Sequence, residues 1–308
     1  MLLMGVSRDR SIYAFLAPAA SAMSQQLQKL ISIGTHPKKG VFTVIPATTT
    51  DTRQQLINKL KEIHLLGWHQ SMRLNSAGMV QPYIAKNGGG YTLEALLGVI
   101  PNGRSEPDYL GWEIKGYSSD RITLMTPEPD AGFYGEAGVK AFVQQYGHPT
   151  ANDTLYFTGL HRVGNRNDST GLTLILDGYD PVQQKITDVN GALQLMTDNG
   201  QPAASWTFAK LMDKWSKKHA QAAFVRYSSN KASLPSFHYE SPVHLGLGTN
   251  FSHFLHALQQ GHVVYDPGSK ISGASSNAAK VKARSQFRIP FKQLPALYEG
   301  FEAEKLSQ

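Results

Sequence analysis

The stretch GRSEPDYLGWEIKGYSS, residues 103–119, places charged side chains in a segment that otherwise has the composition of a buried strand. In a strand, residues two apart share a face, so Glu113 and Lys115 point to one side while Trp112 and Ile114 point to the other. The apolar pair is typical of a side that faces a core. The sequence therefore predicts a carboxylate and an ammonium displayed together on one strand.

Asp108 adds a second carboxylate to this pair. It lies five residues before Glu113, an odd offset, so a straight strand cannot bring it to the same face, and we expect a bend at Gly111. Two carboxylates beside a lysine can hold Mg²⁺, or Mn²⁺ in its place, because these ions prefer oxygen ligands and keep water or substrate phosphate in their shell. Such a metal polarises a phosphodiester and acidifies a water, while Lys115 orients that water or stabilises charge on the phosphate. The pattern indicates phosphodiester hydrolysis, and a surface hairpin with an incidental ion pair is the alternative.

A further carboxylate, Glu94, lies upstream in KNGGGYTLEALLG. This segment predicts a glycine-rich loop, an N-cap at Thr92, one or two helical turns and a stop at Gly98. Glu94 then falls in the first turn, where the helix dipole favours a carboxylate whatever its function. Its presence strengthens the hydrolase interpretation, with the dipole preference as the alternative.

The surrounding segments predict the elements that position these residues. Apolar residues at helical spacing behind a Thr/Asp cluster predict a helix from Thr52 to Leu65. The segments DYLGWEIKGYS and RITLMT predict two strands that pair across the intervening SSD turn. Further strands are predicted in LYFTGLHR, GLTLILDGYD and AAFVRYS, further helices in SWTFAKLMDKWSKKH and NFSHFLHALQQG, and short strands with turns in residues 1–50. The fold class is therefore α/β or α+β with a central sheet.

Composition limits the classes of function. The 308 residues are enough for one large domain or two lobes. Thirty lysines and arginines against 23 acidic residues leave a net charge of +7, which favours a polyanionic partner. The chain has no cysteine, which excludes disulfides, a thiol nucleophile and thiolate zinc sites. No run approaches the roughly 20 apolar residues of a membrane span, and Tyr13 and Pro18 interrupt the apolar run near the N-terminus, so we expect a cytoplasmic protein without a membrane partner.

The motifs GGGYTLEALLG and EPDYLGWEIKGYSS resemble the MvaI/BcnI family of restriction endonucleases, a branch of the PD-(D/E)xK nucleases that is similar to the mismatch-repair nicking enzyme MutH. The segments GLHRV, GLTLILDG, WTFAKLMDKWSKK, HFLHALQQGHVVYD and SQFRIPFKQLPALYEG follow in the order that the family shows, over about residues 67–308. The resemblance implies a restriction-endonuclease-like α/β fold, with a mixed central sheet flanked by helices and two lobes around a DNA cleft. It implies Asp108, Glu113 and Lys115 as the catalytic set and Glu94 as an additional acidic residue, with Mg²⁺ held by the three carboxylates.

The resemblance also implies how the chain is divided and what it binds. Residues 1–50 lie outside it as an N-terminal extension of unknown role, and residues 51–308 form the nuclease domain. Within that domain, a catalytic lobe covers about 70–180 and a DNA-recognition lobe about 181–300. The implied partner is double-stranded DNA, and the implied enzyme is a monomer that serves restriction or phage defence, with a methyltransferase acting on the same site as a candidate companion.

In the recognition lobe the family carries an Asp-x-Arg pair that reads bases, and this chain has Asp266-Pro267-Gly268 in its place. Arg288 remains a candidate reader, because an arginine bidentate to guanine O6 and N7 is the commonest specific contact. A phosphate contact or a surface ion pair is the alternative. The other candidate DNA contacts are Arg284, Asp266, His238 and Arg162.

Other classes of function compete with this interpretation. His253 and His256 lie three apart on one predicted helix face, followed by His262 and Asp266, which would suit a zinc site but for the absence of an H-E-x-x-H general base. The segment KNGGGYT lacks the pattern of a nucleotide-binding P-loop. The remaining alternatives are a non-cutting DNA-binding protein that retains a nuclease fold and a MutH-like repair enzyme that nicks DNA.

Overall fold

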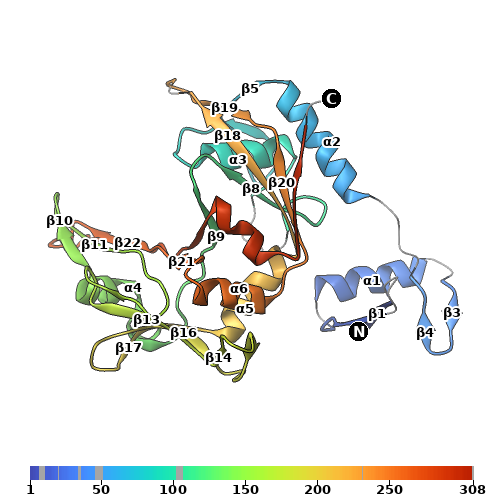
Figure 1. Ribbon diagram of the computed structural model, residues 1–308. Helices are drawn as coiled ribbons and strands as arrows, with labels where there is room; N and C mark the ends of the chain where they lie inside the picture. Colours follow the sequence, from blue (N-terminus) through green and yellow to red (C-terminus); the bar gives the residue numbers. More distant parts are fainter. Residues whose placement is uncertain are drawn as a thin grey trace. The chain divides into compact units, whose positions relative to one another are not determined.

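The computed structural model describes residues 1–6, 11–19, 21–33, 36–45, 51–101, 107–230 and 232–306, and the chain forms two compact units, Met1–Asp51 and Thr52–Gln308 (Figure 1). In these ranges, no helix combines the length and the apolar character needed to cross a membrane. The mixed α/β architecture predicted from the sequence is confirmed.

The first unit consists of a hairpin, a helix and a second, shorter hairpin. β1 (Leu2–Val6) pairs with β2 (Ile12–Leu16), α1 (Ala22–Ile33) follows, and β3 (Lys38–Lys39) pairs with β4 (Phe42–Thr43). The helix differs from the all-strand prediction for residues 1–50. Its sequence AMSQQLQKLISI contains three glutamines and two leucines, which are good helix formers, and no glycine or proline.

The second unit is built around a six-stranded sheet that joins segments far apart in the sequence. Its order is β25–β20–β18–β19–β5, and β8 adds to it by pairing in parallel with β18. The strands are β5 (Trp68–Gln70), β8 (Glu113–Tyr117), β18 (Gln221–Ser229), β19 (Ser236–Tyr239), β20 (Val243–Leu247) and β25 (Gly300–Glu304).

One face of this sheet packs against α2 (Thr52–Leu65), which has the predicted bounds. The apolar residues of α2 are buried in one core with Trp112 and Ile114 of the β8 segment. A third contributor is α3 (Gly88–Leu96), whose Leu93 belongs to the same core. The alternation in the β8 segment therefore predicts its core-facing side correctly.

The other face of the sheet belongs to a second, larger core. Ala222 and Phe224, which lie in that core, are the cross-strand neighbours of Glu113 and Lys115. Because directly paired residues share a face, the two charged side chains point toward this second side. The larger core also includes α5 (Phe208–Lys218), α6 (Phe251–Gln259) and the 3₁₀-helix η1 (Phe291–Leu297).

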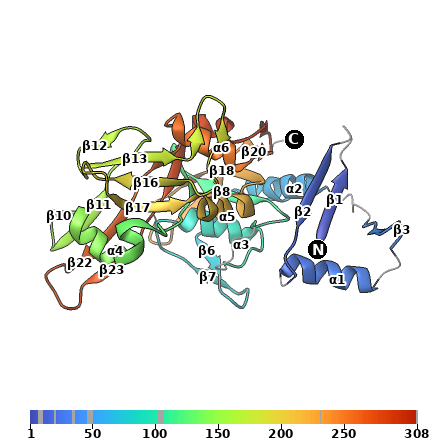
Figure 2. The ribbon, with the colours of Figure 1, turned by 90° about the horizontal axis from the view of Figure 1, so that it is seen from below.

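Three smaller sheets make up most of the remainder of the second unit, and α4 (Gly132–Tyr146) packs against two of them (Figure 2). The first is β10 (His148–Thr150), β11 (Thr154–Thr158), β22 (Gly268–Ser272) and β23 (Lys280–Lys282). The second is β12 (Arg166–Asn167), β13 (Leu172–Asp177), β16 (Ala192–Met196) and β17 (Pro202–Thr207). The third is β21 (Val264–Tyr265), β24 (Phe287–Pro290) and β9 (Arg121–Met125). Two short hairpins complete the strands, β6 (Met72–Leu74) with β7 (Val80–Pro82) and β14 (Tyr179–Asp180) with β15 (Lys185–Ile186).

One sequence prediction about strand order is wrong. β8 and β9 do not form a hairpin across the SSD turn, because β8 pairs with β18 and β9 pairs with β24. Several sheets combine strands that lie far apart in the chain. β18, β20 and β25 complete the β8 sheet, whereas β11 pairs with β22 and β13 pairs with β16.

Candidate functional site

A two-residue turn brings Asp108 to the start of β8. Tyr109 and Trp112 exchange backbone hydrogen bonds of 3.0 and 2.8 Å, and the two residues between them, the second of which is Gly111, have φ angles of 50° and 85°. Positive φ at both central positions is the geometry of a tight hairpin turn. Beyond this turn, the backbone N–H of Ile114 donates to Asp108 Oδ2 over 2.9 Å. The segment just before it, residues 102–106, lies outside the described residues.

Glu113 and Lys115 form an ion pair on β8. Lys115 Nζ donates to Glu113 Oε1. The Lys115 side chain is 20 % exposed and the Glu113 side chain is 2 % exposed. Both partners of such a buried pair are needed, because removing one leaves an uncompensated charge in the interior and lowers the stability of the fold by about 3–5 kcal/mol. The lysine ammonium has three donors, so two are available to another acceptor.

The three residues of this motif meet at the first residue of β8. The nitrogen that donates to Asp108 belongs to the peptide bond that follows Glu113, so the Asp108 carboxylate is held next to the backbone of the residue that carries the ion pair. Their donor set is oxygen only, which suits a hard cation such as Mg²⁺ that takes one or two carboxylates and completes its shell with water and phosphate. Within the described ranges, no group of three or more His, Asp or Glu side chains is placed to hold a metal, so Glu94 does not form one with Asp108 and Glu113.

Tyr117 ends β8 on the same face as Glu113 and Lys115. Its ring stacks on that of Phe291, with centroids 5.2 Å apart. Burial raises the pKa of Tyr117 to about 12. The phenol is therefore protonated at neutral pH and cannot act there as a general base.

Glu94 has a different place in its helix from the one predicted. α3 begins at Gly88, so the three glycines form its first turn instead of a loop, and Glu94 lies in its last turn. Thr92 is not a cap but a buried mid-helix residue, whose Oγ1 accepts from Met72 N over 3.0 Å and donates to Met72 O over 3.2 Å. A carboxylate in the last turn is disfavoured by the helix dipole, so dipole stabilisation does not explain Glu94.

The glycines at the start of α3 allow the helix to approach the sheet closely. A Cβ atom on Gly89 would lie 2.2 Å from Tyr227 Cζ, and one on Gly116 would lie 3.4 Å from the Cα of Gly90. Gly116 directly follows Lys115, so this contact joins α3 to the strand that carries the ion pair. The three glycines thus serve helix–sheet packing. They share the composition of a phosphate-binding loop but not its structure.

Asp266 lies at the centre of a second polar group, formed with Arg121 and Arg288 and called here the Asp266 cluster. Arg288 Nη1 donates to Asp266 Oδ2 over 2.8 Å, and Arg121 Nη1 lies 3.4 Å from the same oxygen. The three residues come from β24, β9 and the residue after β21, which are neighbours in one sheet. Sequence reasoning does not place Arg121 beside Asp266, because the two residues are 145 positions apart and no local signal joins them.

Arg284 covers the position two residues after Asp266. Its backbone carbonyl accepts from Gly268 N over 2.9 Å, and a Cβ atom on Gly268 would lie 3.1 Å from Arg284 Cδ. The side-chain oxygen of Gln286 accepts from Arg284 Nε over 2.8 Å once that amide is oriented to face the guanidinium. Where a side chain is missing at Gly268, an arginine from the adjacent segment therefore fills the space.

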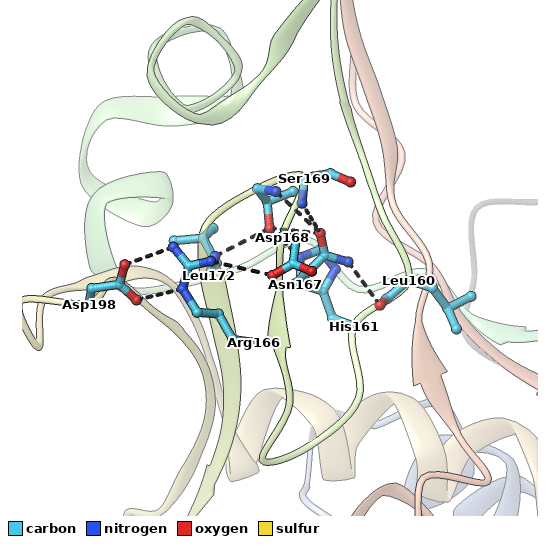
Figure 3. Close-up of polar contacts among 9 residues, drawn as sticks. Leu160, His161, Arg166, Asn167, Asp168, Ser169, Leu172 and Asp198 are labelled. Carbon is cyan, nitrogen blue, oxygen red and sulfur yellow. Dashed lines mark hydrogen bonds and ion pairs between the residues drawn. The ribbon is translucent and has the colours of Figure 1, made fainter.

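Asn167, which lies in β12, closes the chain between β11 and β13 into a loop (Figure 3). Arg162 belongs to the same loop. Asn167 Oδ1 accepts from the backbone nitrogens of Ser169 and Thr170 over 3.1 and 3.2 Å, and its Nδ2 donates to Leu160 O over 3.0 Å. These bonds define the two ends of the loop.

His161 ties the same loop to β21. Its backbone nitrogen donates to Tyr265 O over 2.9 Å, and Tyr265 N donates back over 3.1 Å. The buried ring contacts Thr170 Oγ1 through Nε2 at 2.9 Å, and burial lowers the pKa of His161 to about 4. Arg162 therefore follows a residue that is hydrogen-bonded to Tyr265, the neighbour of Asp266 in the chain. The side chain of Arg162 is exposed.

The remaining candidate histidines lie elsewhere. His238 is on β19, between His64 and Trp68, with ring centroids 5.3 and 5.8 Å away, and it lines an open cavity of about 530 Å³. His253 and His256 lie on α6 and belong to no metal-binding group among the residues that the structure describes.

Comparison with known proteins identifies the family and the fold of the chain. Residues 57–298 match the model of the MvaI/BcnI restriction endonuclease family. Among curated proteins, none is significantly similar to the chain. A solved complex of restriction endonuclease MvaI with its cognate DNA substrate has a TM-score of 0.62 at 17 % identity, covering 84 % of this chain and 100 % of that chain. A structure of MvaI in the absence of DNA has a TM-score of 0.44 at 15 % identity, covering 84 % and 99 %. The fold is that of a restriction endonuclease.

Proposed function

Because the chain belongs to the MvaI/BcnI restriction endonuclease family, we propose that it is a sequence-specific endonuclease that hydrolyses phosphodiester bonds of double-stranded DNA. The observation that carries this proposal is the meeting of Asp108, Glu113 and Lys115 at the start of β8. A buried ion pair is often no more stabilising than apolar residues of the same volume. Its presence there is better explained by catalysis than by stability.

The metal in this proposal is Mg²⁺, with Mn²⁺ as a substitute, and its ligands are Asp108 and Glu113. When bound, such an ion polarises the phosphodiester and acidifies a water molecule. We assign Glu94 as an additional acidic residue, since the helix dipole does not favour a carboxylate in the last turn of α3.

The protein side chains have distinct parts in this reaction. Asp108 is oriented by the Ile114 N–H, which fixes one carboxylate oxygen next to the residue that carries the ion pair. Lys115 is held against Glu113, and its remaining donors can orient the attacking water or stabilise the charge that develops on the phosphate.

Duplex binding is supported by the distribution of basic residues near β22 and β23. Lys270 lies directly opposite Lys282 in that strand pair, an arrangement that is unfavourable unless an anion is nearby. We propose that these lysines contact DNA phosphates, that the Asp266 cluster faces the bases of the duplex, and that Arg284, Arg162 and His238 are further DNA contacts. We further propose that the enzyme acts as a monomer in restriction or phage defence, with a methyltransferase that protects the same site.

The test is cleavage of supercoiled plasmids of known sequence in the presence of Mg²⁺, with mapping of the ends. Asp108→Asn retains an acceptor for Ile114 N but removes the charge, so cleavage should fall about 10²-fold or more while duplex binding persists. Asp198→Asn, which neutralises an exposed carboxylate of an ion pair with Arg166, is the matched control and should cleave normally.

Each other outcome has a definite meaning. Cleavage by the Asp108→Asn variant at the rate of the wild type would show that the β8 motif is an ordinary structural feature. Duplex binding by the wild-type chain without any cleavage would identify a non-cutting DNA-binding protein. Nicked circles that are never linearised would identify a nicking enzyme.

A further inference from the structure

The two arginines of the Asp266 cluster are held very differently. Arg288 donates through Nη1 to Asp266 and through Nη2 to Arg121 O over 3.0 Å, its Nε is buried, and its side chain is only 23 % exposed. Arg121 is 48 % exposed, and its one contact to Asp266, at 3.4 Å, is longer than an ordinary N–H···O hydrogen bond of about 2.7–3.2 Å. Arg288 is therefore fixed in the cluster, whereas the guanidinium of Arg121 can turn to another acceptor at little cost.

The backbone of Arg121 is nevertheless rigidly placed. Its carbonyl accepts from Arg288, the preceding carbonyl of Asp120 accepts from Phe291 N over 2.6 Å, and Arg121 is paired with Pro290 across the β9–β24 ladder. A fixed backbone restricts the positions that the exposed guanidinium can reach, so binding a ligand orders only the rotamers of this one side chain.

Charge at the cluster also favours an external acceptor. One carboxylate faces two guanidinium groups, and both arginines share the single oxygen Asp266 Oδ2. The cluster therefore has an excess positive charge, and most of it lies on the exposed fork of Arg121.

We propose that Arg121 is a base-reading residue of this enzyme, which contacts a guanine through O6 and N7, and that Asp266 and Arg288 are positioning residues that aim it. This inference rests on the proposed function and names the side chain within it that reads a base. Arg121 follows Lys115 by six residues, a chain length of at most about 20 Å. The guanine should therefore lie within about one helical turn of the cut phosphate.

The experiment is selection of duplexes from a randomised library by binding in EDTA, so that the result does not depend on cleavage. Arg121→Ala should lower preference at one base pair by about 5- to 150-fold, the range expected for loss of a bidentate contact to a base. Arg121→Lys should relax the same position, because lysine retains the charge but not the planar fork.

Arg166→Ala is the matched control. Arg166 is 47 % exposed and also pairs with an aspartate, Asp198 at 2.8 Å, so its removal changes the charge by the same amount (Figure 3). The Arg166→Ala variant should select the same sequences from the library as the wild-type protein.

Two results would overturn the inference while leaving the proposed function intact. The first is an unchanged sequence profile in Arg121→Ala. The second is a uniform loss of affinity that Arg121→Lys restores and that lowers the salt slope by about one unit, which identifies a phosphate contact. Failure of the proposed function is distinct, since the wild-type chain would then select no sequence and cut no plasmid.

Discussion

Replacement of Gly89 by alanine should destabilise the protein, whereas the same replacement at Gly90 should not. Both residues lie in the first turn of α3, where alanine gains at most about 1 kcal/mol of helix propensity over glycine. An added Cβ at Gly90 would have no heavy atom within 4 Å outside its own helix and chain neighbours. At Gly89 it would lie 2.2 Å from Tyr227 Cζ, a distance that forces the ring to move.

The cost of that movement follows from the surroundings of Tyr227. Its ring packs edge-on against Phe237, with centroids 5.3 Å apart, and against Tyr239, with centroids 6.0 Å apart. Overpacking of this kind costs about 1–3 kcal/mol, and each disturbed aromatic pair adds about 0.5–1.5 kcal/mol. After the gain in propensity is subtracted, Gly89→Ala should lose about 1–5 kcal/mol, while Gly90→Ala should gain up to about 1 kcal/mol.

Urea unfolding followed by tryptophan fluorescence measures both changes, because Trp112 is buried in the core that α3 contacts. Combining Gly89→Ala with Tyr227→Leu should recover part of the loss, since the two sites are in direct contact and their effects should not add. Equal stability of Gly89→Ala and Gly90→Ala would refute the close approach of α3 to the sheet.

Three further predictions concern metal, salt and pH. Cleavage should stop in EDTA and return with Mg²⁺ or Mn²⁺, and activity in a metal-free preparation with chelator would exclude the metal assignment. The logarithm of affinity for non-cognate duplex should fall linearly with the logarithm of salt concentration, by about 0.9 per phosphate contact, and an affinity indifferent to salt would exclude a basic duplex-binding surface. Since the pKa of His161 is lowered to about 4 from an unfolded value of 6.5, protons bind the unfolded chain better. The buried neutral ring of His161 therefore contributes its full stability above pH 6.5, and the free energy of unfolding falls by about 3 kcal/mol as the pH drops to 4. The free energy of unfolding of the His161→Gln variant should depend less on pH over that range than that of the wild type.

Local features of the sequence predict much of the framework. The bounds of α2, the bend at Gly111 and the core-facing side of the β8 segment all follow from spacing and residue type, which act over a few residues. The mixed α/β class and the family also follow, because their motifs are contiguous in the chain.

Local rules fail where glycine acts through distant contacts. The sequence indicates a loop at Gly88–Gly90, but a helix forms there because the sheet surface at Tyr227 and Gly116 needs close packing without side chains. That shift moves Glu94 from the first turn to the last and reverses the sign of its interaction with the helix dipole.

The partners of charged residues were decided by tertiary structure alone. β8 and β9 adjoin in sequence yet pair with β18 and β24, so Lys115 and Arg121, six residues apart, enter different sheets. The sequence has glycine instead of arginine two residues after Asp266, and the fold supplies Arg288 and Arg121 from neighbouring strands. A hydrogen-bonded strand pair can form between any two segments whose apolar and polar faces match. The free energy of that pairing depends on both segments and on their neighbours, so neither segment alone predicts its partner.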